Sequence, residues 1–330
     1  MTYLIEPLTS GKLTLKNRLV MPPMATSKSE KDGSVSKAIL DYYDEKSQGG
    51  YIGLIVIEHS YITKQGKASE GQLSVANKSD FDGLHKLADV IHKNGSKAVM
   101  QINHAGSAAN TSVTGLDVVG PSAVKNPRLG NVPKELTQEE IKVIIEDFTK
   151  AAVLVKEAGF DGVEIHSAHG YLLNQFFSPL TNKRTDKYGG DVLGRIRLHL
   201  EVIAAVKEAV GDDFPILLRL GASDYMDGGS TIEDSKIAAV EFEKAGIDIL
   251  DISGGFCGYM LANNTTQGYF SSLTKALKEV VSIPVILAGG ITEVNAAEEL
   301  LAEKKADLIG VARAIFKDSK WAEKAIKSFK

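Results

Sequence analysis

One sequence feature constrains the fold of this chain most strongly. A short apolar run is followed by a helical pattern, and this order recurs about eight times along 330 residues. Such runs suit buried strands, because strands covered on both faces read as continuous apolar segments. We expect strands at 19–25, 53–59, 98–103, 162–167, 216–221, 249–253, 285–288 and 308–311.

The helix expected after Thr137 carries the clearest signals. Thr137 and Glu140 form a capping box at its start, and Gly159 stands where the glycine after a helix belongs. Apolar residues between them recur on one face. Similar helix-to-strand junctions, AGFDGVEI, AGIDILDI and KADLIGV, indicate repetition of one unit.

Alternating strands and helices in a chain of this length predict an α/β fold, the (β/α)8 TIM barrel. An open doubly wound sheet is the structural alternative. It would need a phosphate-binding glycine turn after its first strand, where this chain has MPPMATS. No linker-like segment divides the chain, so we expect one domain over residues 1–330. Long loops at 105–136 and 178–191 are expected at the rim of the site, with the stretch 256–270.

Composition narrows the function classes. The net charge of −4, without a basic stripe, argues against nucleic acid and favours a small-molecule ligand. The single cysteine, Cys257, excludes an internal disulfide and a multi-cysteine metal site, and we expect no metal. No signal-peptide pattern and no apolar run of the ~18 residues that a membrane span needs are visible. We therefore expect a cytoplasmic chain with neither membrane nor nucleic-acid partner.

Polar residues cluster where the expected strands end. Strand alternation places Gln101, His166 and Arg219 on faces that converge at one mouth of the barrel. A guanidinium beside an amide suits a planar heterocycle with carbonyl and N–H edges. Any one of these side chains alone could be structural, but their convergence favours a binding site.

The last two expected strands end in glycine-containing loops. Gly289, Gly290 and Arg313 fit the phosphate site that such barrels often build after their seventh and eighth strands. Tight turns would also explain the glycines. A phosphate at one side and a heterocycle at the other describe a phosphorylated planar cofactor, and FMN has that shape.

Longer motifs carry a family resemblance over nearly the whole chain. They are LKNRLVMPPMATS, QINHAG, AGFDGVEIHSAHGYLLNQFFSPLTNKRTDKYGG, LLRLGASDY, AGGI and DLIGVARA. With them the sequence resembles the Old Yellow Enzyme family of FMN-dependent ene reductases. The resemblance implies that NADPH or NADH reduces FMN. It also implies that flavin N5 then passes a hydride to the activated C=C bond of an α,β-unsaturated carbonyl, nitroalkene or quinone.

The resemblance also implies roles for individual residues. His166 and His169 would bind the substrate carbonyl oxygen, and Tyr171 would donate the proton. With the glycines of the expected phosphate site included, the residues expected to contact the cofactor are Pro22, Pro23, Met24, Ala25, Thr26, Gln101, Arg219, Gly289, Gly290, Ala312 and Arg313.

Several positions depart from the family pattern. Ala25 stands where thermophilic-type members have a cysteine, and no arginine follows Arg313 to reach a neighbouring subunit, so a homo-oligomer stays an open expectation. His59 stands where a small residue is expected, and a substrate contact and a rim position are equally consistent with it. Some branches of the family carry an iron–sulfur cluster and further domains. Because this chain has a single cysteine and 330 residues, we expect that it does not belong to those branches.

Two other functions stay open at this level. A flavin-free lyase or isomerase would use His166 and His169 as acid and base on a phosphorylated small molecule. Alternatively, the chain could be a non-catalytic protein that sequesters FMN or a carbonyl ligand. The presence of the complete set of His166, His169 and Tyr171 argues against this alternative. In the loop 105–136, Lys125, Arg128 and Lys134 are candidate contacts for the 2′-phosphate of NADPH or are simply solvated.

Overall fold

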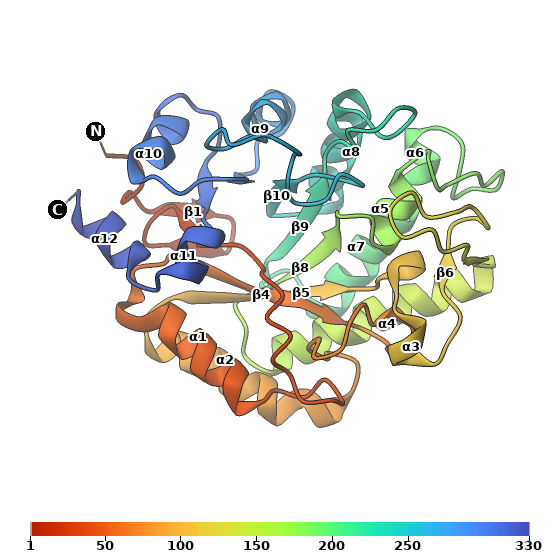
Figure 1. Cartoon of the computed structure of the whole chain (residues 1–330), viewed down its shortest axis with the longest axis horizontal. Helices are drawn as coiled ribbons and strands as arrows, with labels where there is room; N and C mark the ends of the chain where they lie inside the picture. Colours follow the sequence, from red (N-terminus) through yellow and green to blue (C-terminus); the bar gives the residue numbers. More distant parts are fainter. Residues whose placement is uncertain (1, 330) are drawn as a thin grey trace.

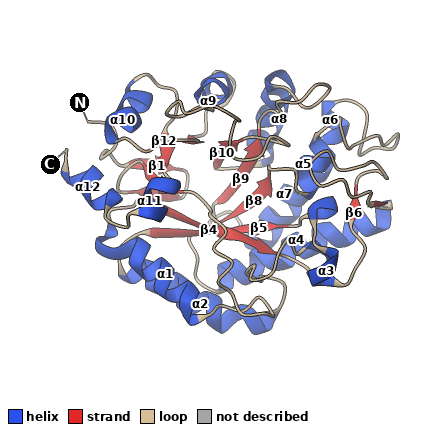
Figure 2. Ribbon diagram, viewed as in Figure 1, coloured by secondary structure: helices blue, strands red, loops and turns tan. Residues whose placement is uncertain are grey.

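The computed structural model describes residues 2–329, in which eight parallel strands close into a barrel surrounded by helices (Figures 1 and 2). The order around the barrel follows the sequence, and the last strand pairs with the first. The strands are β3 (Leu19–Met21), β4 (Leu54–Tyr61), β5 (Lys97–Asn103), β8 (Gly162–Ser167), β9 (Ile216–Gly221), β10 (Ile249–Ser253), β11 (Val285–Ala288) and β12 (Leu308–Gly310). The predicted (β/α)8 barrel is confirmed.

Two strand ends differ from the prediction by more than one residue. β3 ends at Met21 rather than at residue 25, because Pro22 and Pro23 have no N–H to give to a neighbouring strand. β4 continues to Tyr61 rather than ending at residue 59. The segment after Met21 therefore leaves the barrel wall as a loop at the C-terminal end of the strands.

Helices cover the outside of the barrel. α4 begins after the predicted capping box of Thr137 and Glu140, and Gly159 follows its C-cap with φ +90°. No helix within residues 2–329 is both long and apolar enough to cross a membrane. The helices are α1 (Lys37–Ser47), α2 (Phe81–Lys93), α3 (Thr111–Thr114), α4 (Gln138–Glu157), α5 (Leu172–Phe177), α6 (Val192–Arg195), α7 (Arg197–Val210), α8 (Ile232–Ala245), α9 (Ser271–Lys278), α10 (Val294–Ala302), α11 (Arg313–Lys317) and α12 (Trp321–Lys327).

Apolar side chains fill the N-terminal half of the barrel interior. Val20, Val99 and Leu217 belong to this buried cluster. The antiparallel hairpin of β1 (Leu8–Ser10) and β2 (Leu13–Leu15) adds Leu13 and Leu15 to it. Sequence patterns did not predict this hairpin. Because apolar packing occupies this half of the barrel, any cavity in the barrel interior lies at the opposite, C-terminal end.

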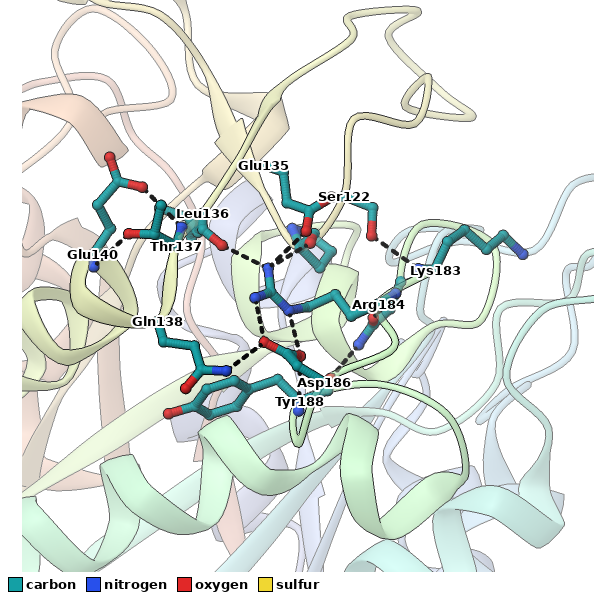
Figure 3. A network of polar contacts seen from close by, with 12 residues as sticks. Ser122, Glu135, Leu136, Thr137, Gln138, Glu140, Lys183, Arg184, Asp186 and Tyr188 are labelled. Atoms are coloured by element: carbon teal, nitrogen blue, oxygen red, sulfur yellow. Dashed lines mark hydrogen bonds and ion pairs between the residues drawn. The ribbon is translucent and has the colours of Figure 1, made fainter.

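Arg184 ties the long loops of that end together (Figure 3). Its guanidinium donates to the backbone oxygens of Pro121 at 2.9 Å and Leu136 at 2.6 Å. It also pairs with both carboxylate oxygens of Asp186, at 2.9 and 2.6 Å, and these bonds lower the pKa of Asp186 to about 2. The segment containing the two-residue strands β6 (Val119–Gly120) and β7 (Lys134–Glu135) is therefore fixed to the loop after α5.

Candidate active site

A cavity of about 570 Å³ opens among the loops that follow the barrel strands. The sequence predicted fourteen site residues, and all except Thr26 line this cavity. The further lining residues are His59, Ser253, Tyr259, Met260, Tyr269, Ala288, Ile291, Gly310 and Phe316.

Thr26 lies beside the cavity and binds Glu58. Its backbone N–H and its hydroxyl donate to the two carboxylate oxygens of Glu58, each at 2.7 Å. Burial raises the pKa of Glu58 to about 7, although the bonds from Thr26 oppose the rise. Thr26 and Glu58 thus fix the end of the loop that lines the cavity, and the expected approach of Thr26 to a bound flavin stays a prediction.

A buried polar cluster lies at the barrel end of the cavity. Gln101 donates from Nε2 to Oε2 of Glu164 at 2.6 Å, and Nη1 of Arg219 lies 3.4 Å from Oδ2 of Asp251. The Arg219–Asp251 contact lacks hydrogen-bond geometry, so Nε and Nη1 of Arg219 have no acceptor within residues 2–329. Since buried donors are nearly always paired, these two call for a ligand with acceptor atoms. A heterocycle with carbonyl and ring-nitrogen edges meets that need.

The two carboxylates of this cluster are perturbed by their surroundings. Burial raises the pKa of Glu164 to about 8, and the nearby Asp251 adds to the rise while Arg219 opposes it. Burial also raises the pKa of Asp251 to about 6, again against the opposing charge of Arg219. The positive charge of Arg219 therefore lies beside two carboxyl groups, Glu164 and Asp251, that burial keeps from ionising readily. An electron-rich ligand bound next to Arg219 would be stabilised by this charge.

Backbone N–H groups gather at the other side of the cavity. Gly290 adopts φ +72°, and a Cβ there would lie 2.6 Å from the ring of Tyr269, so glycine is required. The N–H groups of Gly290, Ala312 and Arg313 donate to no backbone acceptor within residues 2–329. Among residues 2–329, the Arg313 guanidinium has only the sulfur of Met260 as a partner, at 3.6 Å. Free N–H groups beside a guanidinium suit a phosphate.

His166, His169 and Tyr171 form an aromatic cluster in the cavity. The ring centroid of His166 lies 5.1 Å from that of His169 and 5.1 Å from that of Tyr171. Burial, with Arg219 nearby, lowers the pKa of both histidines well below the usual 6.5. Burial raises the pKa of Tyr171. The site therefore presents two neutral imidazoles and a protonated phenol, which are hydrogen-bond donors and a proton source.

Sequence reasoning missed some supporting residues. Asp251 and Ser253 share the inward face of β10 with Ile249, so the alternation of that strand carried a signal for both. Gln72, which contacts His59, comes from an irregular loop, where no periodic pattern could have identified it. The sequence also placed Glu164 on the inward face without assigning it a role.

Known proteins resemble this chain in sequence and in fold. The model of the NADH:flavin oxidoreductase / NADH oxidase family matches residues 3–330. NADH oxidase from Thermoanaerobacter brockii is 44% identical over 96% of this chain and 49% of its own length. NADPH dehydrogenase from Clostridium acetobutylicum is 38% identical over 96% of this chain and 92% of its own.

Solved structures are similar over 99% of this chain. The complex of 2-naphthoyl-CoA reductase has a TM-score of 0.94 and 30% identity, with 52% of that chain covered. The old yellow enzyme homologue from Zymomonas mobilis has a TM-score of 0.87 and 26% identity, with 93% covered.

The chain thus spans about half the length of some relatives, the Thermoanaerobacter brockii protein among them. These matches therefore do not support the expectation that this chain lies outside the longer, multidomain branches of the family. The chain belongs to the FMN-dependent NADH:flavin oxidoreductase / NADH oxidase family, the Old Yellow Enzyme family.

Proposed function

We propose that this chain uses FMN and NADH or NADPH to reduce the activated C=C bond of α,β-unsaturated carbonyl compounds, nitroalkenes or quinones. The observation that carries the proposal is that His166, His169 and Tyr171 line the same cavity as the unpaired donors of Arg219. Relatives named NADH oxidase and NADPH dehydrogenase support the use of a nicotinamide donor.

The residues present fit FMN. Gln101 and Arg219 would hold its pyrimidine edge, where the free Nε and Nη1 of Arg219 find acceptors. The free N–H groups of Gly290 and Ala312, with Arg313, would hold its phosphate. When bound, FMN supplies hydride transfer from its N5 atom. The Arg219 charge at that edge would favour the electron-rich form of the cofactor.

His166 and His169 would bind the carbonyl oxygen of the substrate. The backbone N–H of Ala168 donates to Nδ1 of His166 at 3.3 Å, which leaves the ring proton on Nε2. Nε2 of His169 contacts Ser253, which leaves its Nδ1 for a ligand. Negative charge develops on the carbonyl oxygen as the β-carbon receives the hydride. A preorganised donor aimed at such an oxygen typically lowers the barrier by roughly 3–4 kcal/mol.

Tyr171 would complete the reduction by giving its phenolic proton to the α-carbon. Its raised pKa keeps the O–H in place at neutral pH. Hydride at one carbon and a proton at the other balance the two-electron reduction of the double bond. A flavin-free lyase or isomerase, the alternative considered from the sequence, is disfavoured because the chain belongs to an FMN-dependent family.

The direct test is anaerobic turnover of the FMN-loaded protein with 2-cyclohexen-1-one and NADH or NADPH. The expected product is cyclohexanone, formed in equal amount to the nicotinamide consumed. Consumption of nicotinamide only when oxygen is admitted, with the enone recovered intact, would overturn the proposal and leave an oxidase.

A further inference from the structure

His59 is a cavity residue with hydrogen-bonding capacity to which the proposed reaction assigns no task. It lies near the C-terminal end of β4 and lines the cavity. Its ring stacks on Tyr171, with centroids 5.3 Å apart and an interplanar angle of 20°. It also lies edge-on to His166 at 6.3 Å. His59 is therefore beside the residues proposed to contact the substrate.

The amide of Gln72 fixes the tautomer of His59. Oε1 of Gln72 accepts the backbone N–H of Ala68 at 2.7 Å, and because a backbone N–H can only donate, the orientation of this amide is determined. Nε2 of Gln72 then donates to Nδ1 and to the carbonyl oxygen of His59, each at 3.1 Å. Nδ1 of His59 is therefore an acceptor, and the ring proton lies on Nε2.

A second amide supports the same state. Nδ2 of Asn103 lies 3.3 Å from Nδ1 of His59. Both amide residues are buried, with 2% of Gln72 and none of Asn103 exposed. Two N–H donors facing one ring nitrogen oppose its protonation, and burial with the Arg219 charge lowers the pKa of His59 to about 4. His59 thus stays a neutral donor through the physiological range.

The donor atom of His59 is unpaired in the described part of the chain. Nε2 of His59 makes no hydrogen bond to any residue from 2 to 329, whereas Nδ1 is held by Gln72 and Asn103. The ring lines the cavity. An oriented N–H group that the protein leaves free in a cavity is available to a ligand acceptor.

We propose that His59 is a specificity-determining donor. It binds a second acceptor oxygen of the substrate and makes the site prefer alkenes flanked by two carbonyls, such as cyclic enediones and quinones, over simple enones. The inference rests on the proposed function, because it takes His166 and His169 as ligands of the first carbonyl oxygen. The His59 ring lies beside His166 and stacks on Tyr171, so its free N–H is close to the residues proposed to bind and protonate the substrate.

The test compares 2-cyclohexene-1,4-dione with 2-cyclohexen-1-one, which differ by one carbonyl. His59→Phe keeps a ring against Tyr171 but removes the N–H. The ratio of kcat/KM for the dione to that for the enone should fall about tenfold, as expected for one lost hydrogen bond in a buried site. His59→Gln, which restores an N–H donor, should recover part of the ratio.

His85→Phe is the matched control. His85 also stacks on an aromatic ring, that of Phe81, at 5.9 Å and 6°, but it does not line the cavity. This variant should keep the parent ratio. An unchanged ratio in His59→Phe would overturn the inference. Equal losses of kcat/KM for both substrates in His59→Phe, together with weaker FMN binding, would also overturn it. That result would show that the His59 N–H binds the cofactor rather than the substrate.

A spectroscopic measurement addresses the tautomer without turnover. In ¹⁵N spectra of the loaded protein, the His59 signals, identified by their loss in His59→Gln, should show Nε2–H from pH 6 to 8. An imidazolium or an Nδ1–H tautomer in that range would contradict the inference. A parent protein that NADH reduces but that turns over neither substrate would instead overturn the proposed function.

Discussion

Nε2 of His169 lies 2.7 Å from Oγ of Ser253, the last residue of β10. The backbone of His169 adopts φ +61°, an uncommon conformation for a residue with a side chain. Its N–H donates to the oxygen of Gly254 at 3.2 Å, and Arg128 donates to its carbonyl oxygen at 3.1 Å. A strand end and a distant loop therefore hold this imidazole in one place.

Ser253→Ala should loosen the His169 ring. We expect binding of a phenolic ligand such as 4-hydroxybenzaldehyde to weaken about tenfold, since one hydrogen bond to a site donor is lost. The change is measured by titrating the absorbance of the loaded protein. Ser223→Ala, which alters a serine outside the cavity, should leave the affinity unchanged. Equal affinities in Ser253→Ala and the parent would show that this contact does not position the ring.

Tyr171→Phe should separate the two half-reactions. We expect reoxidation by 2-cyclohexen-1-one to slow by about a hundredfold or more, as for loss of a general acid, while reduction by NADH or NADPH changes little. Stopped-flow absorbance measures both steps. Tyr225→Phe, at an exposed tyrosine outside the cavity, is the control. Comparable slowing of both steps in Tyr171→Phe would remove Tyr171 from proton donation.

The pH dependence follows from the shifted groups of the substrate site. The pKa of His166 and of His169 is lowered, so both rings are neutral above pH 6.5. The pKa of Tyr171 is raised, so its proton is retained well above pH 8.5. The rate of reoxidation should therefore show no titration of these three groups between pH 6.5 and 8.5. An inflection in that range that disappears in Tyr171→Phe would contradict the assignment.

Arg219→Met should destabilise the FMN-free protein in a pH-dependent way. The variant leaves Glu164 and Asp251 buried without their cation, at a cost of about 3–5 kcal/mol. Arg219 lowers the pKa of both carboxylates, so its removal raises their folded-state values further above those of the unfolded chain. The folded state then binds more protons than the unfolded state, and stability falls as pH rises.

Urea unfolding at pH 5.5 and pH 8 tests this expectation. The loss in Arg219→Met should be larger at pH 8. Lys37→Met, which removes an exposed ion pair with Asp41, should change the unfolding free energy by less than about 1 kcal/mol at either pH. A loss in Arg219→Met that is the same at both pH values would show that the carboxylates do not depend on this charge.

The barrel was predictable because its information is local and periodic. Apolar runs marked strands such as β8 and β10, and the Thr137–Glu140 capping box marked the start of α4. The end of β3 was missed, although its cause, the absent N–H groups of Pro22 and Pro23, is visible in the sequence. The β1–β2 hairpin was missed because three-residue strands are too short to show a period.

The site was predictable to the extent that its residues sit on strands or in long motifs. Gln101 and Arg219 followed from strand alternation, and His166 to Tyr171 from the motif that they belong to. The tautomer of His59 could not be predicted, because it depends on Gln72, an amide that only the folded chain brings to the ring. The bond between Thr26 and Glu58 could not be predicted, because Glu58 lies 32 residues away on the neighbouring strand.

The central claim is that one cavity takes electrons from a nicotinamide through FMN and passes them to an activated alkene. The most direct measurement is the visible absorbance of the anaerobic FMN-loaded protein, first with NADH or NADPH and then with 2-cyclohexen-1-one. We predict a yellow spectrum that bleaches with the nicotinamide and returns with the enone. A protein that takes up no FMN, or whose bleached spectrum persists after the enone is added, would contradict the account.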